Sequence, residues 1–415
     1  MTRPLPQSVR IYRVGGSVRD ELLGLPVNDS DFVVVGATPE MMLAADYLPV
    51  GKDFPVFLHP QTHDEYALAR TERKQGRGYR GFRFFATPDV TLEDDLRRRD
   101  LTINAMARAA DGQLIDPYGG EADLHEGVLR HVSEAFAEDP LRVLRVARFA
   151  ARFGFRIADD TVALMRAIAN SGELATLAPE RIWQELSRGL SEGHPSRMLD
   201  ALRACGALAK LLPEIDALYA IPVGGEDDAG AFTARALDWA ALRTMTLPAR
   251  YAVLAQELDR AGDDRFDARA GIERAEAMSS RLRVPTDCDD AARLAVRWHH
   301  AIADAPSLAS AALLDLLLAT DALRRPERLA TLASAAAAHV AARATGEANE
   351  RRRTALLQEA LVVVRRVDAA AIARDAVERT AKTPGAARGD AIASALRAAR
   401  LAALREWKSR KRAER

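Results

Sequence analysis

The chain has 415 residues, 48% of them hydrophobic and 28% charged, and this composition is typical of a soluble globular protein. The length suits two to four domains with sizeable cores. Because the formal net charge is zero, any polyanionic partner must be held by local basic patches and not by the field of the whole molecule.

Membrane and secreted proteins are disfavoured by two further features. There is no apolar run of 18 residues, and the first residues lack the apolar stretch of a signal peptide. The only two cysteines, Cys205 and Cys288, lie far apart in the sequence, which indicates a reducing compartment and no disulfide framework. We therefore expect a cytoplasmic protein without a membrane segment.

The first 125 residues mix strands, helices and turns. Strands are predicted at 11–16, 31–36, 55–59, 64–71 and 112–120. Helices are predicted at 17–24 and 91–107, and the basic, glycine-rich segment 72–82 is predicted to be a loop. This mixture predicts an α/β or α+β domain.

From Leu124 onward the patterns indicate helices almost throughout. Amphipathic helices are predicted at 138–155, 159–172 and 178–190. Residues 222–231 are predicted to be a boundary loop, and the alanine-rich remainder is interrupted at 382–390. The basic end, 405–415, is either a frayed, solvated terminus or an RNA contact.

Two carboxylates precede the buried strand Phe32–Val35. Asp29 and Asp31 are two residues apart, so on a strand they share one face and repel each other. A divalent cation between them would turn that repulsion into coordination, and Mg²⁺ prefers such oxygen ligands. Taken alone, the pair is also compatible with a solvated strand end.

A phosphate-binding turn is predicted just upstream. Gly15, Gly16 and Ser17 lie between the first strand and the helix, where glycines let a triphosphate approach the backbone. Arg19 lies in the first turn of that helix and could reach the same anion. The segment matches neither a P-loop nor a GxGxxG fingerprint. A phosphate cradle followed by a carboxylate pair on the next strand points to nucleotidyl transfer.

These segments together resemble a known family. Residues 14–36 resemble the first motif of the class II tRNA nucleotidyltransferases, the CCA-adding enzymes. The second to fifth motifs are matched by 92–107, 116–132, 138–155 and 178–186. The resemblance is strong through about residue 220 and fainter beyond it. It implies an α+β fold whose nucleotidyltransferase head, of the polymerase-beta type, is followed by a helical neck, body and tail.

The resemblance also implies domain bounds, ligands and roles. The head would span 1–125, the base-reading neck 126–220 and the body and tail 221–415. The ligands would be Mg²⁺, CTP, ATP and tRNA, with no obligate protein partner. Asp29 and Asp31 would hold the metal, Glu65 or Glu72 could add a third carboxylate, and Asp100 and Asn104 look structural or sugar-directed. The nucleotide-contacting residues would be Gly16, Arg19, Arg99, Asp139, Arg142, Arg145 and Arg148.

The implied reaction is attack of the tRNA 3′-hydroxyl on the α-phosphorus of CTP or ATP. Mg²⁺ would lower the pKa of that hydroxyl, and pyrophosphate would leave beside a second Mg²⁺ and Arg19. Asp139 and Arg142, at i and i+3 of a predicted helix, would offer an acceptor beside a donor. That pair fits the Watson–Crick edges of C and A and mispairs with U and G.

Structural alternatives exist for the same residues. Asp139 before Pro140 is also a helix N-cap, and Arg145 and Arg148 could lie on a solvated face. Some relatives carry a His-Asp phosphohydrolase domain, but Gln256 and Glu257 stand where its first pair is expected. His299 and His300 alone cannot complete such a site, so they are predicted to be surface or packing residues of a degenerate domain, without phosphatase activity.

Three other functions remain possible. A poly(A) polymerase of the same family would use ATP alone and carry a longer basic extension. A His-Asp phosphohydrolase is disfavoured by its missing ligands. A catalytically inactive RNA-binding protein is disfavoured because both aspartates and the glycine turn are present.

Overall fold

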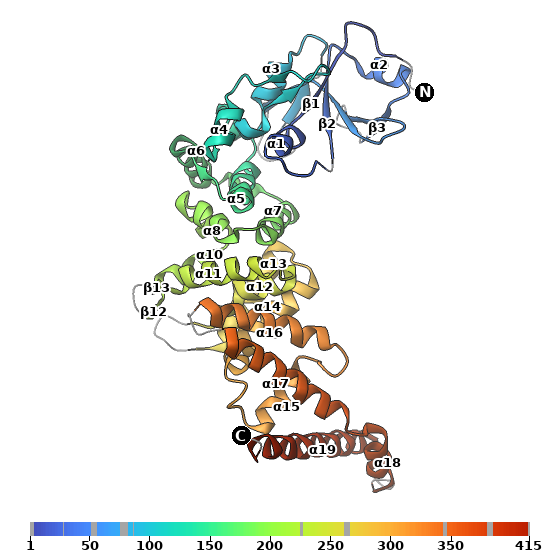
Figure 1. The fold of residues 1–415 in the computed structure, drawn as a ribbon, viewed down its shortest axis with the longest axis vertical. Coiled ribbons are helices and arrows are strands. Elements are labelled where there is room, and N and C mark those ends of the chain that lie inside the picture. Colours follow the sequence, from blue (N-terminus) through green and yellow to red (C-terminus); the bar gives the residue numbers. More distant parts are fainter. Residues whose placement is uncertain are drawn as a thin grey trace. The chain divides into compact units, whose positions relative to one another are not determined.

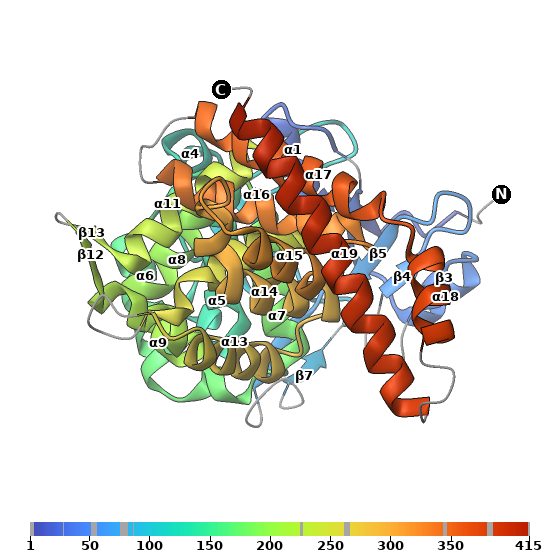
Figure 2. The same ribbon diagram turned by 90° about the horizontal axis from the view of Figure 1, so that it is seen from below.

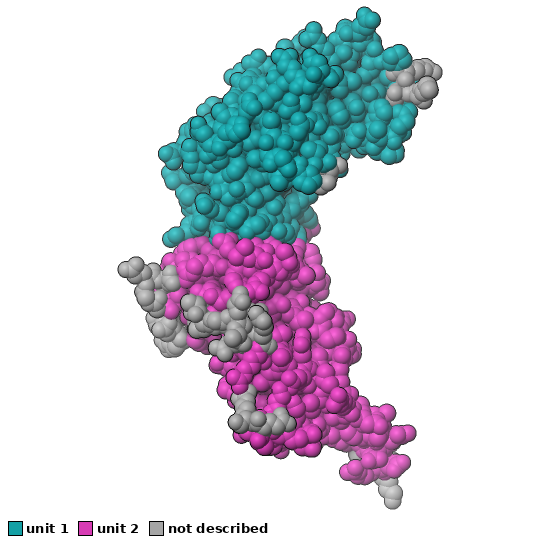
Figure 3. All heavy atoms as spheres, viewed as in Figure 1, with its two compact units in different colours: residues 1–216 teal, residues 217–415 magenta. Residues whose placement is uncertain are grey.

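The computed structural model describes residues 4–27, 29–50, 56–74, 82–85, 87–224, 227–260, 266–342, 347–379 and 385–413. It divides into two compact units, residues 1–216 and 217–415, coloured separately in Figure 3. No helix among the described residues is both long and apolar enough to cross a membrane. Each unit is described by itself below.

A mixed sheet of seven strands forms the core of the first unit, in the order β3-β4-β5-β2-β1-β8-β9 (Figure 1). Strand β2 lies between β1, to which it is antiparallel, and β5, to which it is parallel. The strands are β1 (Arg10–Val14), β2 (Asp31–Val35), β3 (Leu48–Val50), β4 (Val56–Leu58), β5 (Glu65–Leu68), β8 (Ala107–Arg108) and β9 (Leu114–Ile115). The sheet carries α1 (Gly16–Leu22) after β1, α2 (Pro39–Ala44) after β2 and α3 (Leu92–Arg97) before β8.

Alternation along β2 places its side chains on two different cores. Val33 packs in a cluster with Val14, Leu96 and Ala105, whereas Val34 packs with Met42 and others on the opposite face. Asp31 has the parity of Val33 and therefore points to the face covered by α3. This register confirms the predicted strand and fixes the face of its first carboxylate.

From Gly120 to Asp216 the first unit is helical apart from a short parallel strand pair. Helix α5 packs against α7 and α8. Its elements are α4 (Gly120–Glu126), β10 (Val128–Leu129), η3 (Glu134–Glu138), α5 (Leu141–Phe153), β11 (Arg156–Ile157), α6 (Asp159–Asn170), η4 (Glu173–Thr176), α7 (Pro179–Ser191), α8 (Pro195–Ala204), α9 (Ala207–Leu211) and α10 (Pro213–Asp216).

The second unit is built from helices around α14, which packs against α12, α13 and α16. The long last helix, α19, is seen along its length in Figure 2. The elements are η5 (Ala217–Ala220), β12 (Pro222–Gly224), β13 (Asp227–Asp228), α11 (Ala229–Leu242), α12 (Leu247–Ala255), η6 (Gln256–Asp259), α13 (Ala268–Leu282), α14 (Thr286–Ala303), α15 (Ser310–Ala319), α16 (Pro326–Ala342), α17 (Glu347–Arg365), α18 (Ala369–Arg379) and α19 (Gly385–Ala413). The predicted α+β class, a mixed-sheet head followed by helices, is confirmed.

The predicted single helix over 91–107 is wrong. Helix α3 ends at Arg97, a short 3-10 helix, η2 (Thr102–Asn104), follows, and Ala107 already belongs to β8. The Asp100 carboxylate accepts a hydrogen bond from the Leu101 backbone N–H at 2.9 Å, a local bond that competes with helix continuation. The break turns Arg99 and Asn104 toward the sheet.

Two predicted loops also differ. Within 72–82, residues 72–74 belong to β6 (Thr71–Lys74), which pairs with β7 (Phe82–Phe85), and 75–81 lie outside the described residues. Residues 222–231 carry the β12–β13 pair and the start of α11, inside the second unit. The predicted domain bounds stay a prediction, since the two units do not test a division at residue 125.

Candidate active site

Three carboxylates gather at the exposed start of β2. Asp31 is its first residue, and Asp29 lies in the extended segment just before it, not on the strand as predicted. Glu65, the first residue of the parallel neighbour β5, pairs in register with Asp31, so both side chains are on one face. The backbone of Glu72 belongs to β6, which pairs with β7 and not with this sheet.

The positive charge of Arg99 acts on the Asp31 carboxylate. Burial raises the pKa of the Asp31 carboxyl, the Arg99 guanidinium opposes that rise, and the Asp29 charge adds to it. Arg99 also donates to Asp95 at 3.2 Å, and its buried Nε has no hydrogen-bond partner among the described residues. A cation with unused donor capacity therefore lies beside the carboxylates.

The glycine turn between β1 and α1 is shaped around Arg99. Gly15 has φ 73°, and a Cβ at this position would lie 2.8 Å from Arg99 Nη1. Only glycine therefore combines this backbone conformation with such a close approach. Helix α1 has just seven residues, so its dipole is short. Two guanidinium groups lie against the turn, because Arg19 Nη2 would lie 3.3 Å from a Cβ at Gly16.

Arg19 is buried in a polar chain and does not line an open surface. Its Nη1 donates to Asn104 Oδ1 at 2.5 Å, and its guanidinium lies over the ring of Phe149, 5.2 Å from the centroid. Asn104 in turn donates to Asp100 at 3.0 Å, and Asp100 accepts from Arg145 at 2.7 Å. This chain connects the glycine turn, η2 and α5.

The row of arginines along α5 is paired with acids, so the solvated-face alternative is wrong. Arg148 donates to Glu185 of α7 at 2.5 Å in a buried ion pair. Arg152 donates to Asp20 of α1 at 3.0 Å. Together with the Arg145–Asp100 pair, these bonds connect α5 to α1, to α7 and to the segment that follows α3.

Asp139 lies just before α5 and is not part of it, so the predicted i and i+3 placement on one helix is wrong. Its Oδ1 accepts from the Leu141 backbone N–H at 3.0 Å, as a helix-start residue does, and its Oδ2 accepts from Arg181 of α7 at 3.0 Å. Arg142, in the first turn, donates to the carbonyls of Ala135 and Arg98 at 2.8 and 2.7 Å. Both side chains are therefore held in fixed positions.

The predicted site residues thus fall into two groups. The carboxylates, Gly16 and Arg99 lie around the start of β2 and the glycine turn, while Arg142, Arg145 and Arg148 lie on α5 with Asp139 before it. Sequence reasoning missed their acidic partners Asp20 and Glu185, and also Arg181. Glu185 and Arg181 lie within the fifth motif, and their four-residue spacing on α7 was the available signal.

His299 is buried and the His300 side chain is 39% exposed, in line with their prediction as packing or surface residues. His299 and His300 of α14 come together with Glu257 and Asp259 of η6 and with His339 of α16. Sequence reasoning gave His339 no role.

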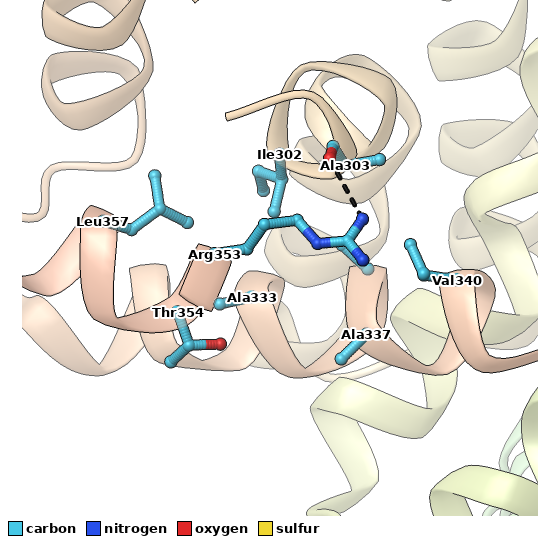
Figure 4. Close-up of a pocket in the computed structure, with 9 residues that line it drawn as sticks. Ile302, Ala303, Ala333, Ala337, Val340, Arg353, Thr354 and Leu357 are labelled. Carbon is cyan, nitrogen blue, oxygen red and sulfur yellow. Dashed lines mark hydrogen bonds between the residues drawn. The ribbon is translucent and has the colours of Figure 1, made fainter. Parts of the chain in front are cut away.

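A small pocket in the same unit contrasts with this cluster. It is lined mainly by apolar side chains of α14, α16 and α17, and Arg353 donates across it to the Ala303 carbonyl at 3.1 Å (Figure 4). Its volume, about 10 Å³, admits about one water molecule, so it offers no nucleotide site.

Comparison with known proteins agrees with the geometry of the head. A family model described as the poly A polymerase head domain matches residues 11–130, and a second, described as a probable RNA and SrmB- binding site of polymerase A, matches residues 154–219. A multifunctional CCA protein of Azoarcus sp. (strain BH72) is 53% identical over 384 residues, which cover 89% of this chain and 93% of the relative. The chain belongs to the multifunctional CCA protein family.

Another family member and a solved structure support the same family assignment and fold. A multifunctional CCA protein of Methylobacillus flagellatus is 50% identical over 95% of this chain and 97% of its own length. The crystal structure of the Bacillus stearothermophilus CCA-adding enzyme in complex with CTP superposes with a TM-score of 0.67, covering 98% of this chain and 95% of that one at 24% identity. That likeness shows that the chain has the fold of a CCA-adding enzyme.

Proposed function

We propose that the protein adds and repairs the 3′-terminal CCA of tRNA without a nucleic-acid template, from CTP and ATP with release of pyrophosphate. The observation that carries this proposal is the meeting of Asp29, Asp31 and Glu65 beside Arg99 and the Gly15 turn. Family membership supports it, because the relatives are multifunctional CCA proteins.

The carboxylates fit Mg²⁺ by their chemistry. They supply hard oxygen donors at the exposed start of the central strands β2 and β5, where substrate phosphates and water can fill the remaining positions. Asp29 and Asp31 would hold the ion and Glu65 would stand beside Asp31. When bound there, Mg²⁺ would activate the attacking hydroxyl and neutralise the charge of the leaving pyrophosphate.

The protein's own groups position the triphosphate. The Gly15–Gly16 turn lets phosphate approach the backbone, and Arg99 supplies the neighbouring cation with an unused donor. Arg19 acts on this site through Asn104, which it holds by a short hydrogen bond. Arg19 and Arg145 thereby fix η2 and the position of Arg99 from opposite ends of one polar chain.

Asp139 and Arg142 are proposed to read the base. Each is anchored by bonds to the backbone, and Asp139 also by Arg181, so little side-chain entropy is lost when a base binds. A carboxylate oxygen accepts more than one hydrogen bond, so Asp139 keeps acceptor capacity for the amino groups of C and A. Substitution of Asp139 by Ala should therefore let UTP and GTP be incorporated.

Poly(A) addition is the rival within the fold, and it is not favoured because the curated relatives are named CCA proteins. tRNA would be held mainly through phosphates and 2′-hydroxyls, since every tRNA must be accepted. A cytoplasmic location is part of the same proposal.

The test is an incorporation assay with tRNA lacking its last three nucleotides, Mg²⁺ and each labelled nucleoside triphosphate in turn. Wild-type protein is expected to add two C residues and one A residue, and Asp31→Asn to add none while tRNA still binds. Glu65→Gln should slow incorporation, and Glu121→Gln, at an exposed position of α4, serves as its control. Incorporation of ATP alone in long runs would replace the proposal by poly(A) addition.

A further inference from the structure

The last turn of α3 contains a carboxylate that is entirely buried. Asp95 is 0% exposed, whereas aspartates are seldom buried completely unless they are paired. Its Oδ2 accepts a hydrogen bond from Arg99 Nη2 at 3.2 Å, and its Oδ1 accepts from Arg98 Nη2 and Nε at 2.7 and 3.1 Å. Each carboxylate oxygen therefore holds one guanidinium group.

The backbone supplies a further donor to the same carboxylate. The Arg70 N–H, just after β5, donates to Asp95 Oδ1 at 3.4 Å. Strand β5 begins with Glu65, the neighbour of Asp31 in the register of the sheet. Asp95 therefore connects the end of α3 to the chain that leaves the carboxylate-bearing part of the sheet.

Asp95 is ionised in the folded protein. Burial opposes ionisation, but the charges of Arg98 and Arg99, together with hydrogen bonds from Arg98 and the Arg70 N–H, outweigh burial and lower the pKa of Asp95 below its ordinary 3.8. The side chains of Arg98 and Arg99 are only 16% and 19% exposed. A fixed negative charge therefore stands beside two cations that have little access to water.

Arg99 turns its other nitrogens toward the glycine turn. Its Nη1 lies 2.8 Å from the position that a Cβ at Gly15 would take and donates to the Asn104 carbonyl at 3.4 Å. Its buried Nε has no hydrogen-bond partner within the described ranges. Because a guanidinium group is planar and rigid, the bond that fixes Nη2 on Asp95 also fixes the directions in which Nη1 and Nε donate.

We propose that Asp95 is a positioning residue of the nucleotide site: it holds Arg99 beside the glycine turn, where this cation binds the triphosphate of CTP or ATP. The inference rests on the proposed function, which makes these nucleotides the substrates. Asp95 has no part in reading the base, which is left to Asp139 and Arg142. Loss of Asp95 should therefore weaken CTP and ATP equally and leave the rejection of UTP and GTP unchanged.

The neighbouring Asp94 provides a matched control. Asp94 is exposed and closes a capping box at the start of the same helix. Its Oδ2 accepts from the Thr91 N–H at 3.2 Å, and its own N–H donates to Thr91 Oγ1 at 3.1 Å. Asp94→Asn should therefore weaken the start of α3 and leave nucleotide binding unchanged.

The test measures the dissociation constant of labelled CTP by equilibrium dialysis with the full chain and Mg²⁺, separately from incorporation. The amide of Asp95→Asn can accept from only one of the two guanidinium groups, so CTP and ATP should each bind at least about tenfold more weakly, with tRNA affinity unchanged. Equal CTP affinities of Asp95→Asn and Asp94→Asn would overturn the proposal. A wild-type chain that binds CTP but incorporates no CMP would contradict the proposed function alone.

A double-mutant cycle shows whether Asp95 acts through Arg99. Arg99→Ala should itself weaken CTP binding, and adding Asp95→Asn should then have almost no further effect, because the cation to be positioned is gone. The same loss in both backgrounds would mean a merely structural role and would refute the proposal. If Asp95→Asn does not fold, Asp95→Asn combined with Arg98→Met, which removes one charge of each sign, decides instead: wild-type CTP affinity in that variant contradicts the proposal.

Discussion

The arginines of α5 show how a chain with zero net charge holds several cations in fixed positions on one helix. Arg145, Arg148 and Arg152 each contact a carboxylate from another element. These bonds fix the guanidinium positions before a nucleotide arrives, so little reorganisation is needed when it binds. The acidic partners matter as much as the arginines, because a buried guanidinium without a counter-charge is strongly unfavourable.

The Arg148–Glu185 pair offers a test of that claim. The side chains are only 9% and 5% exposed, so Glu185→Ala should lower the free energy of unfolding by about 3–5 kcal/mol. The control is Glu126→Ala, which breaks an exposed pair with Arg156 (66% and 62% exposed) and should cost less than about 1 kcal/mol. Urea unfolding measures both, and equal losses would mean that burial of the first pair contributes nothing.

Asp100 makes the stability of the first unit depend on pH. Burial opposes its ionisation, but Arg145 and the hydrogen bond from Asn104 outweigh burial, so the pKa of Asp100 lies below its ordinary 3.8. Since the folded pKa is depressed, the stabilisation is present above about pH 4 and is lost as pH falls toward the folded pKa. The difference in unfolding free energy between wild type and Asp100→Asn should therefore shrink below about pH 4. A difference that stays constant from pH 7 to pH 3 would contradict this account.

Among the elements, those defined by local pattern were predicted and those defined by distant contacts were not. Strands β1 and β2 and helix α1 follow from apolar alternation, a glycine pair and a stop at Gly24. The break after α3 depends on Asp100, which is held by Arg145, 45 residues away in the sequence. The local bond from the Leu101 N–H to Asp100 is thus supported by a contact from outside the segment, and the segment's own pattern does not show that contact.

The candidate site divides in the same way. The face of Asp31 and the glycine turn were predictable, because strand parity and backbone freedom are local properties. Asp29 lies before the strand, so parity does not place it. The in-register position of Glu65 required the parallel pairing of β2 with β5, which no local pattern gives. The histidine cluster was missed because its members come from η6, α14 and α16, far apart in the sequence.

The turn between β1 and α1 is the element most open to a clean test. Gly15→Ala places a Cβ 2.8 Å from Arg99 Nη1 at φ 73°, so it should displace Arg99 and slow CMP incorporation by roughly 10²-fold. Gly112→Ala is a matched control, because φ there is 89° but no atom lies within 4 Å of the added Cβ. Both variants should lose roughly 1 kcal/mol of stability. Equal activities of the two variants would mean that the approach of Arg99 to the turn is unimportant.

Because the whole molecule has zero net charge, tRNA must bind through local basic surfaces. Affinity for tRNA should nevertheless fall at least tenfold between about 50 and 200 mM KCl, because each phosphate contact releases counterions. Arg410 and Arg412, in the basic last turn of α19, are expected to contribute, so their replacement by Gln should flatten the slope. Filter binding at rising salt measures this, and an unchanged slope in the variant would assign the tail to the frayed-terminus alternative.

Carboxylates at the start of β2 are proposed to hold the catalytic metal below the triphosphate, and diffraction can show whether they do. Crystals grown with CTP and Mn²⁺ in place of Mg²⁺ should show an anomalous peak within bonding distance of the Asp29 and Asp31 carboxylates, with the triphosphate between that peak and the Gly15 turn. A nucleotide bound elsewhere, with no anomalous peak at those two side chains, would contradict the account.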